Sequence, residues 1–100
     1  MNDPELEEIK KRKVKELMEK AKTKVIVYST PACPFCDLAK RYLKEHNIEY
    51  VDYNVAADRE KAREMYMKSG QLGVPVLDIN GTIIVGFDKQ AIAKALGIDE

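Results

Sequence analysis

The sequence predicts an α/β domain in which a strand–helix–strand unit is followed by a helix, a β-hairpin and a last helix. Short apolar runs rich in β-branched residues, typical of strands, alternate with segments whose apolar residues recur at helical spacing. One strand, helix and strand follow each other within about 30 residues, the usual size of a unit with parallel strands and a right-handed crossover. Asn80-Gly81, between two apolar runs, is a strong signal for a two-residue hairpin turn of type I′.

The first expected element is a separate helix over residues 3–22, with Asp3 as its N-cap and Pro4 as its first residue. Acidic residues gather in its first turns and lysines in the later ones, as the helix dipole favours. Its apolar stripe is thin, so we interpret it as a mostly solvated helix that rests on the domain, with partner docking or dimerisation as the alternatives. The chain is therefore divided into a charged helical extension, residues 1–22, and a domain, residues 23–100.

The remaining elements alternate along the domain. Strands are expected over residues 24–29, 49–55, 74–79 and 82–85, and helices over residues 34–46, 58–69 and 88–96. Asp88 is expected to cap the last helix, and Gly70 and Gly97 to end the last two helices. The apolar residues expected in the core are Val25, Val27, Leu38, Leu43, Val51, Val76, Ile79, Ile84, Ile92 and Leu96, with Tyr28, Tyr42, Tyr53 and Tyr66 in the core or at its edge.

Composition and charge exclude several classes of protein. The 100 residues carry 17 basic and 17 acidic side chains, so no basic face for nucleic acid is expected. No apolar run approaches the ~20 residues of a membrane span, and the charged N-terminus lacks the apolar stretch of a secretory signal. We therefore expect a monomeric cytoplasmic domain without nucleic-acid or membrane partners.

Both cysteines of the chain, Cys33 and Cys36, form a Cys-x-x-Cys pair between the first strand and the following helix. A thiol at a helix N-terminus meets unsatisfied N–H groups and the positive end of the helix dipole, and both favour a thiolate. Structural disulfides are rare in a reducing compartment, and this bridge would close too small a loop to add much stability. The spacing and position therefore predict a disulfide that forms and breaks.

Two motifs, Cys33-Pro34-Phe35-Cys36 and Gly73-Val74-Pro75-Val76 with the hairpin behind it, resemble those of thioredoxin-fold proteins in their short glutaredoxin-like form. The resemblance covers residues 24–97 and leaves the N-terminal helix unaccounted for. It implies a thioredoxin-like fold, a four-stranded mixed sheet flanked by three helices, to which the N-terminal helix is an addition. It also implies a cis peptide bond before Pro75, which would face the cysteines.

Thiol chemistry then predicts a thiol–disulfide oxidoreductase that acts on disulfide-containing proteins. Cys33, partly exposed, attacks the target disulfide as a thiolate, and Cys36, one turn inside, resolves the mixed disulfide. Pro34 stiffens the first helical turn. Phe35 is expected either to contact a partner or to pack.

The resemblance further implies a set of residues that bind substrate or a thiol: Thr30, Pro34, Phe35, Gln71, Val74, Pro75, Gly86, Phe87 and Asp88. Glutathione is the candidate co-substrate, with no bound cofactor and no metal. Gln71 matches a residue of glutathione-binding members, but Thr30 stands where many glutaredoxins carry a lysine. Val85 and Lys89 also depart from the family's Gly-Gly-x-Asp-Asp segment, so the glutathione site is half present.

A second branch of the family matches the same turn. Pro31-Ala32-Cys33, Cys36-Asp37 and Gly86-Phe87 are similar to NrdH-type redoxins, which are reduced by thioredoxin reductase, whereas Pro34-Phe35 is closer to glutaredoxins. Both thioredoxin reductase and glutathione therefore remain open as electron donors. Our preference is a redoxin without strong glutathione dependence.

Two other functions are the alternatives. The two thiolates form half of a four-ligand site, so a metal- or Fe–S-binding module would need ligands from a second chain or from free thiols. The only histidine, His46, lies at the far end of the active helix, about 15 Å from Cys36 at 1.5 Å per residue. The other alternative is an adaptor that uses the fold and the N-terminal helix without redox turnover.

Overall fold

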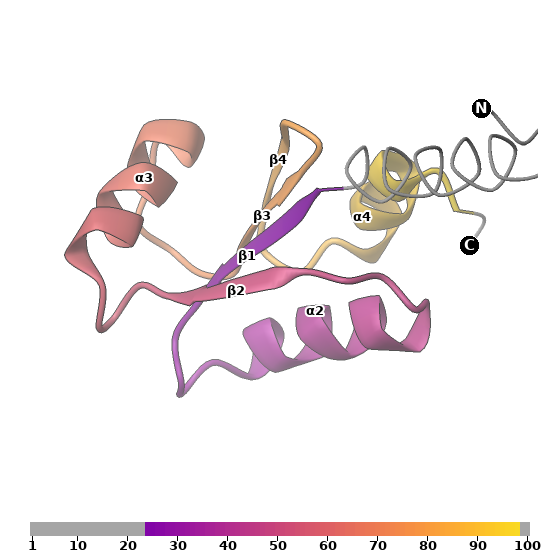
Figure 1. The fold of residues 1–100 in the computed structure, drawn as a ribbon, viewed down its shortest axis with the longest axis horizontal. Helices are drawn as coiled ribbons and strands as arrows, with labels where there is room; N and C mark the ends of the chain where they lie inside the picture. The colour runs from indigo at the N-terminus through magenta and orange to yellow at the C-terminus, as the bar shows by residue number, and fades with distance from the viewer. Residues whose placement is uncertain (1–23, 99–100) are drawn as a thin grey trace, which may run out of the picture.

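A computed structural model describes residues 24–98 of the chain, and the N-terminal helix expected over residues 3–22 lies outside this range (Figure 1). The elements, in chain order, are β1 (Val25–Ser29), α2 (Pro34–Glu45), β2 (Val51–Asn54), α3 (Arg59–Ser69), β3 (Val76–Ile79), β4 (Thr82–Val85) and α4 (Lys89–Leu96). Every element predicted within this range is confirmed, with bounds that shift by at most two residues.

The four strands form one mixed sheet in the order β2-β1-β3-β4. β1 and β2 are parallel, as the predicted strand–helix–strand unit requires, and β3 is antiparallel to both β1 and β4. Asn80 and Gly81 join β3 to β4 with φ values of 52° and 93°, the two positive angles that a type I′ turn needs. The hairpin prediction is therefore confirmed.

Helices cover both faces of the sheet, with α2 and α4 on one face and α3 on the other (Figure 1). Because side chains alternate along a strand, Val25 and Val27 of β1 pack in the cluster with α2 and α4. Ile26 and Tyr28 point the other way and pack with Met65 of α3. All five residues of β1 are buried, which explains why this strand reads as a continuous apolar run.

Three of the residues expected in the core or at its edge are exposed, so those predictions are wrong. Leu38 of α2 lies about 100° around the helix from the buried Ala39, at the margin of the buried face. Val51 lies on β2, which has a neighbouring strand on one side only among the described residues. Tyr66 follows Met65, the one residue of α3 that is buried, and is half exposed.

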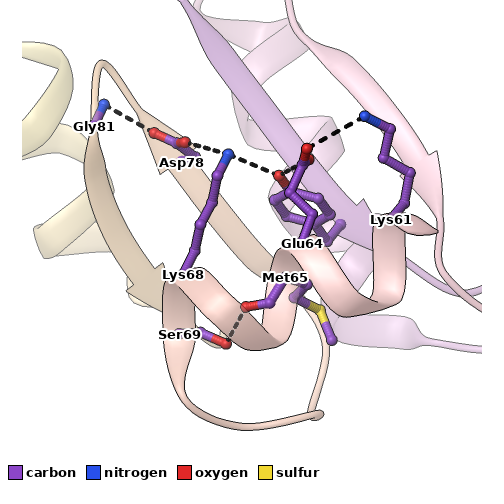
Figure 2. A network of polar contacts seen from close by, with 8 residues as sticks. Lys61, Glu64, Met65, Lys68, Ser69, Asp78 and Gly81 are labelled. Atoms are coloured by element: carbon purple, nitrogen blue, oxygen red, sulfur yellow. Dashed lines mark hydrogen bonds and ion pairs between the residues drawn. The ribbon is translucent and has the colours of Figure 1, made fainter. Parts of the chain in front are cut away.

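A chain of polar contacts fastens α3 to the sheet. The Tyr28 hydroxyl donates to Glu64 of α3 at 2.5 Å and accepts from the Lys68 ammonium at 2.8 Å. Lys68 also donates to Asp78 of β3 at 2.7 Å, and Asp78 accepts from the Gly81 N–H of the hairpin turn (Figure 2). α3, two strands and the hairpin are thus joined through side chains that lie mostly out of water.

These contacts shift the protonation equilibria of their members. Burial, together with the hydrogen bond to Glu64, raises the pKa of Tyr28 to about 12. The same hydrogen bond is the main cause that lowers the pKa of Glu64. Burial lowers the pKa of Lys68, but its hydrogen bonds to Asp78 and Tyr28 outweigh burial and leave that pKa above its ordinary value. The network is therefore built around neutral Tyr28 between an ionised acid and an ionised amine.

None of the helices within residues 24–98 is long and apolar enough to cross a membrane.

Candidate active site

The two cysteines lie at the start of α2, directly after β1 and a short turn. Cys33 is the N-cap of the helix, and its sulfur accepts a hydrogen bond from the Cys36 N–H at 3.2 Å. The pair is joined as a disulfide with a Cα–Cα distance of 5.2 Å. An N–H group that points at Cys33 Sγ at a helix N-terminus also stabilises the thiolate of this residue when the bond is open.

The two sulfurs differ in accessibility. Cys36 is fully buried in the first turn of α2, whereas Cys33 is half-buried at the helix end. Only Cys33 can therefore meet a sulfur of another protein, while Cys36 can reach Cys33 from inside. The arrangement allows disulfide exchange in which one thiol attacks and the other resolves.

The loop between α3 and β3 lies against this turn. The Val74–Pro75 peptide bond is cis, as the resemblance implied, and the Val74 carbonyl oxygen lies 3.9 Å from Cys33 Sγ. Pro75 is buried, and its carbonyl accepts from the Gly86 N–H at 2.8 Å. Cys33, Cys36, Val74 and Pro75 are thus brought together, and Gly86 supports this group from the end of β4.

Gln71 does not extend towards a ligand but folds back on its own loop. Its side-chain oxygen accepts from the Gly73 N–H at 2.6 Å, and its Nε2 donates to the Gly73 carbonyl and to Ser69 Oγ, each at 3.2 Å. Ser69 Oγ in turn donates to the Met65 carbonyl at the end of α3. The amide that a glutathione site would use is therefore engaged in shaping the loop before Pro75.

Two other predicted site residues have structural contacts. Phe87 packs against the core cluster and meets the ring of Tyr42 on α2 edge-on, with centroids 6.3 Å apart. Asp88 is the N-cap of α4 and accepts from the Ala91 N–H at 3.1 Å. Phe87 thus holds the segment before α4 against the core and Asp88 begins the helix, so these contacts account for both residues without a ligand.

The remaining predicted site residues surround the disulfide in sequence and differ in exposure. Thr30 is half-buried after β1, and Pro34 is exposed at the first position of α2. Phe35 is 62% exposed, so the interpretation as packing is wrong and its ring is free to contact a partner.

Sequence reasoning missed Leu72, which is 68% exposed in the same loop as Val74. The signal was present, since an apolar residue between Gly70 and Gly73 has no strand or helix to bury it. Together with Phe35 it adds exposed apolar surface to the segments that flank the disulfide.

Within residues 24–98, no group of three or more His, Cys, Asp or Glu side chains is placed to hold a metal ion. Cys33 and Cys36 would thus supply two of the four ligands of a tetrahedral site.

Comparison with known proteins gives matches to the same part of the chain. The family model described as glutaredoxin matches residues 25–84. A glutaredoxin-like 8.6 kDa protein in the rubredoxin operon of Clostridium pasteurianum is 53% identical over 70 residues, which are 70% of this chain and 93% of the relative. A glutaredoxin of Neisseria meningitidis is 36% identical over 77 residues, covering 75% of this chain and 91% of the relative.

Solved structures also match this part of the chain. The crystal structure of a mutant of the thioredoxin-like protein BC3987 superposes with a TM-score of 0.71 at 27% identity, covering 75% of this chain and 96% of the other. The fold is thus thioredoxin-like, as the resemblance implied. With a family model that matches more than half of its residues, the chain belongs to the glutaredoxin family.

Proposed function

We propose that the protein is a thiol–disulfide oxidoreductase that reduces protein disulfides through its Cys33–Cys36 pair. One observation carries the proposal: a partly exposed Cys33 caps α2, accepts the Cys36 N–H and is bonded to a fully buried Cys36. Membership of the glutaredoxin family supports thiol–disulfide chemistry in general.

The reaction cycle consists of two thiol–disulfide exchange steps. The Cys33 thiolate attacks one sulfur of the target disulfide, so a Cys33–target bond forms and the other target sulfur leaves as a thiolate. The Cys36 thiolate then attacks Cys33 Sγ, which forms the Cys33–Cys36 disulfide and releases the second target thiolate. Two electrons pass from the protein to the target, and a reductant must return two.

We further propose that thioredoxin reductase, rather than glutathione, is the main reductant. Three features support this: Gln71 is engaged within its own loop, Thr30 supplies no cation, and Lys89 stands where the family's segment carries an acid. Each removes a contact that would hold glutathione.

A coupled assay tests both parts. The oxidised protein is supplied with NADPH and either thioredoxin reductase or glutathione with glutathione reductase, and NADPH consumption is followed in the presence of a protein disulfide. We expect turnover with thioredoxin reductase and much slower turnover with glutathione. Cys33→Ser is the control and should be inactive in both arms.

Turnover with glutathione alone would contradict the proposed donor and leave the exchange chemistry intact. Absence of turnover in both arms, together with no reaction of the dithiothreitol-reduced protein with a small disulfide, would contradict the exchange chemistry itself.

A further inference from the structure

An open groove of about 410 Å³ lies between α2 and the edge strand β2. Its lining residues are Asp37, Lys40, Arg41, Lys44, Tyr50 and Asp52. It begins at the residue after Cys36 and continues along α2 away from the disulfide. Its volume is within the usual range for a site that holds a ligand or a short segment.

The groove has unbalanced positive charge. Asp52 is already engaged, because one oxygen accepts from Ser29 Oγ at 2.5 Å and the other pairs with the Lys40 ammonium at 3.1 Å. Arg41 and Lys44 are exposed, and no ion pair joins either of them to another residue within the described range 24–98. Two cations are thus left facing solvent against the single carboxylate of Asp37.

The distance of the groove from Cys33 determines which part of a bound partner can reach the groove. Arg41 follows Cys33 by eight positions, which corresponds to about 12 Å along a helix. An extended chain advances about 3.3 Å per residue, so about four residues span that distance. A partner whose cystine lies over Cys33 would place side chains near Arg41 and Lys44 at this separation.

We propose that this groove binds an acidic segment of the protein partner, with carboxylates roughly three to five residues from the reacting cysteine. The proposal rests on the proposed function, since it names a feature of the disulfide substrate. A segment with several carboxylates fits better than one small anion, because Arg41 and Lys44, one helical turn apart, are on long exposed side chains and do not line a buried pocket. The groove would raise the association rate and orient the partner, without any part in the exchange step itself.

The test measures single-turnover reduction by dithiothreitol-reduced full-length protein, so that no electron donor is involved. The substrates are three disulfide peptides of one sequence that carry two Glu, two Gln or two Lys about four residues from the cysteine. Hydroxyethyl disulfide is a fourth, uncharged substrate too small to reach the groove. The variants are Arg41→Glu/Lys44→Glu in the groove and, as matched control, Arg59→Glu/Arg63→Glu, two exposed arginines on α3 across the sheet.

We expect the wild-type protein to reduce the Glu peptide about five- to tenfold faster than the Lys peptide at low salt. The groove variant should reverse that order and leave the rate with hydroxyethyl disulfide unchanged. The α3 variant should keep the wild-type ratio within about twofold, since α3 packs on the opposite face of the sheet from α2. Salt at about 0.3 M should remove most of the discrimination.

Equal rates for the three peptides, or an equal change from the groove and α3 variants, would overturn the proposal. So would competition by millimolar inorganic phosphate at constant ionic strength, which would mean a site for a free anion. A change in sedimentation with the groove variant would instead mean a contact between two copies. Failure of the proposed function is distinguishable, because hydroxyethyl disulfide would then not react with any of the proteins.

Discussion

The side chain of Gln71 encloses the backbone of Gly73. Its oxygen accepts the Gly73 N–H at 2.6 Å while its nitrogen donates to the Gly73 carbonyl at 3.2 Å. A Cβ at position 73 would lie 2.7 Å from that oxygen, so the absence of a side chain there is what lets the amide close over the backbone. These two residues therefore define the shape of the loop that continues into Val74 and Pro75.

Gly73→Ala and Gln71→Ala should be strongly non-additive. Each single substitution should reduce the free energy of unfolding by about 1 kcal/mol, because each breaks the same hydrogen bonds in a largely exposed loop. The double variant should be no less stable than either single one, since the added methyl group then meets no amide. Denaturant unfolding of the four proteins measures the coupling, and additive losses would mean that the two residues act separately.

The same Gln71→Ala variant should leave the KM for glutathione unchanged, since its amide is already engaged with Ser69 and Gly73. A severalfold rise in that KM, greater than the one that Gly73→Ala produces, would place the side chain in a glutathione site.

Substitution of the two cysteines should have different results. Cys33→Ser should abolish reduction of protein disulfides, because the accessible sulfur is lost. Cys36→Ser should instead accumulate mixed disulfides between Cys33 and the target, because nothing resolves them. Intact-mass spectrometry of the reaction mixture measures the adducts, and equal, mild effects of both substitutions would contradict the assigned roles.

Lys68→Met should reduce the free energy of unfolding by about 2 kcal/mol, because it leaves the largely buried carboxylate of Asp78 without its cation. Lys61→Met is the matched control on the same helix. Lys61 pairs with Glu64 at 3.4 Å where both side chains are about one third exposed, so its loss should change stability clearly less than the loss of Lys68 does. Denaturant unfolding near pH 7 compares the two variants. Equal losses of unfolding free energy would mean that the ion pair of Lys68 with Asp78 stabilises the protein no more than the exposed pair of Lys61 does.

Stability should fall at high pH as Tyr28 ionises. The pKa of Tyr28 is raised from 10.0 to about 12, so the folded state retains a proton that the unfolded chain loses. This contribution is complete below pH 10 and is lost as the pH rises from 10 to about 12. An absorbance titration should reveal one tyrosine near pH 12 that Tyr28→Phe removes, and a loss of amplitude near pH 10 instead would contradict the burial of this hydroxyl.

At low pH the stability contributed by the same network should depend on pH in the opposite direction, because the group that titrates there is Glu64. The hydrogen bond from Tyr28 lowers the pKa of Glu64, so the stability it adds is complete above the ordinary value of 4.5 and is lost as the pH falls below it. Because that hydrogen bond is the main cause, Tyr28→Phe should also flatten the acid limb of the stability curve. Chemical unfolding at a series of pH values measures this, with Tyr50→Phe as a control.

Signals from residues close together in the sequence were sufficient to predict the helices, the strands and the Cys33–Cys36 pair. Asp88 caps α4 as its type and position predicted, because an N-cap is satisfied within three residues of the chain, and Asp58 caps α3 in the same way. The turn at Asn80 follows from two residues that tolerate positive φ. The Cys33–Cys36 pair was identified from a spacing and from the strand–helix boundary beside it.

What could not be read from local patterns depends on partners that are distant in the chain. Leu38 and Val51 were expected in the core on hydrophobicity, but whether a side chain is buried depends on which elements cover it, and within residues 24–98 β2 has a neighbouring strand on one side only. The same holds for charge: Lys68 finds Tyr28, 40 residues away, while Arg41 finds no carboxylate within residues 24–98. The resemblance implied a ligand contact for Gln71. In the folded loop its side-chain amide instead forms hydrogen bonds with the backbone of Gly73, two residues further along the chain. Helices, turns and the reactive pair thus follow from neighbours along the sequence, whereas burial and charge pairing follow from neighbours in space.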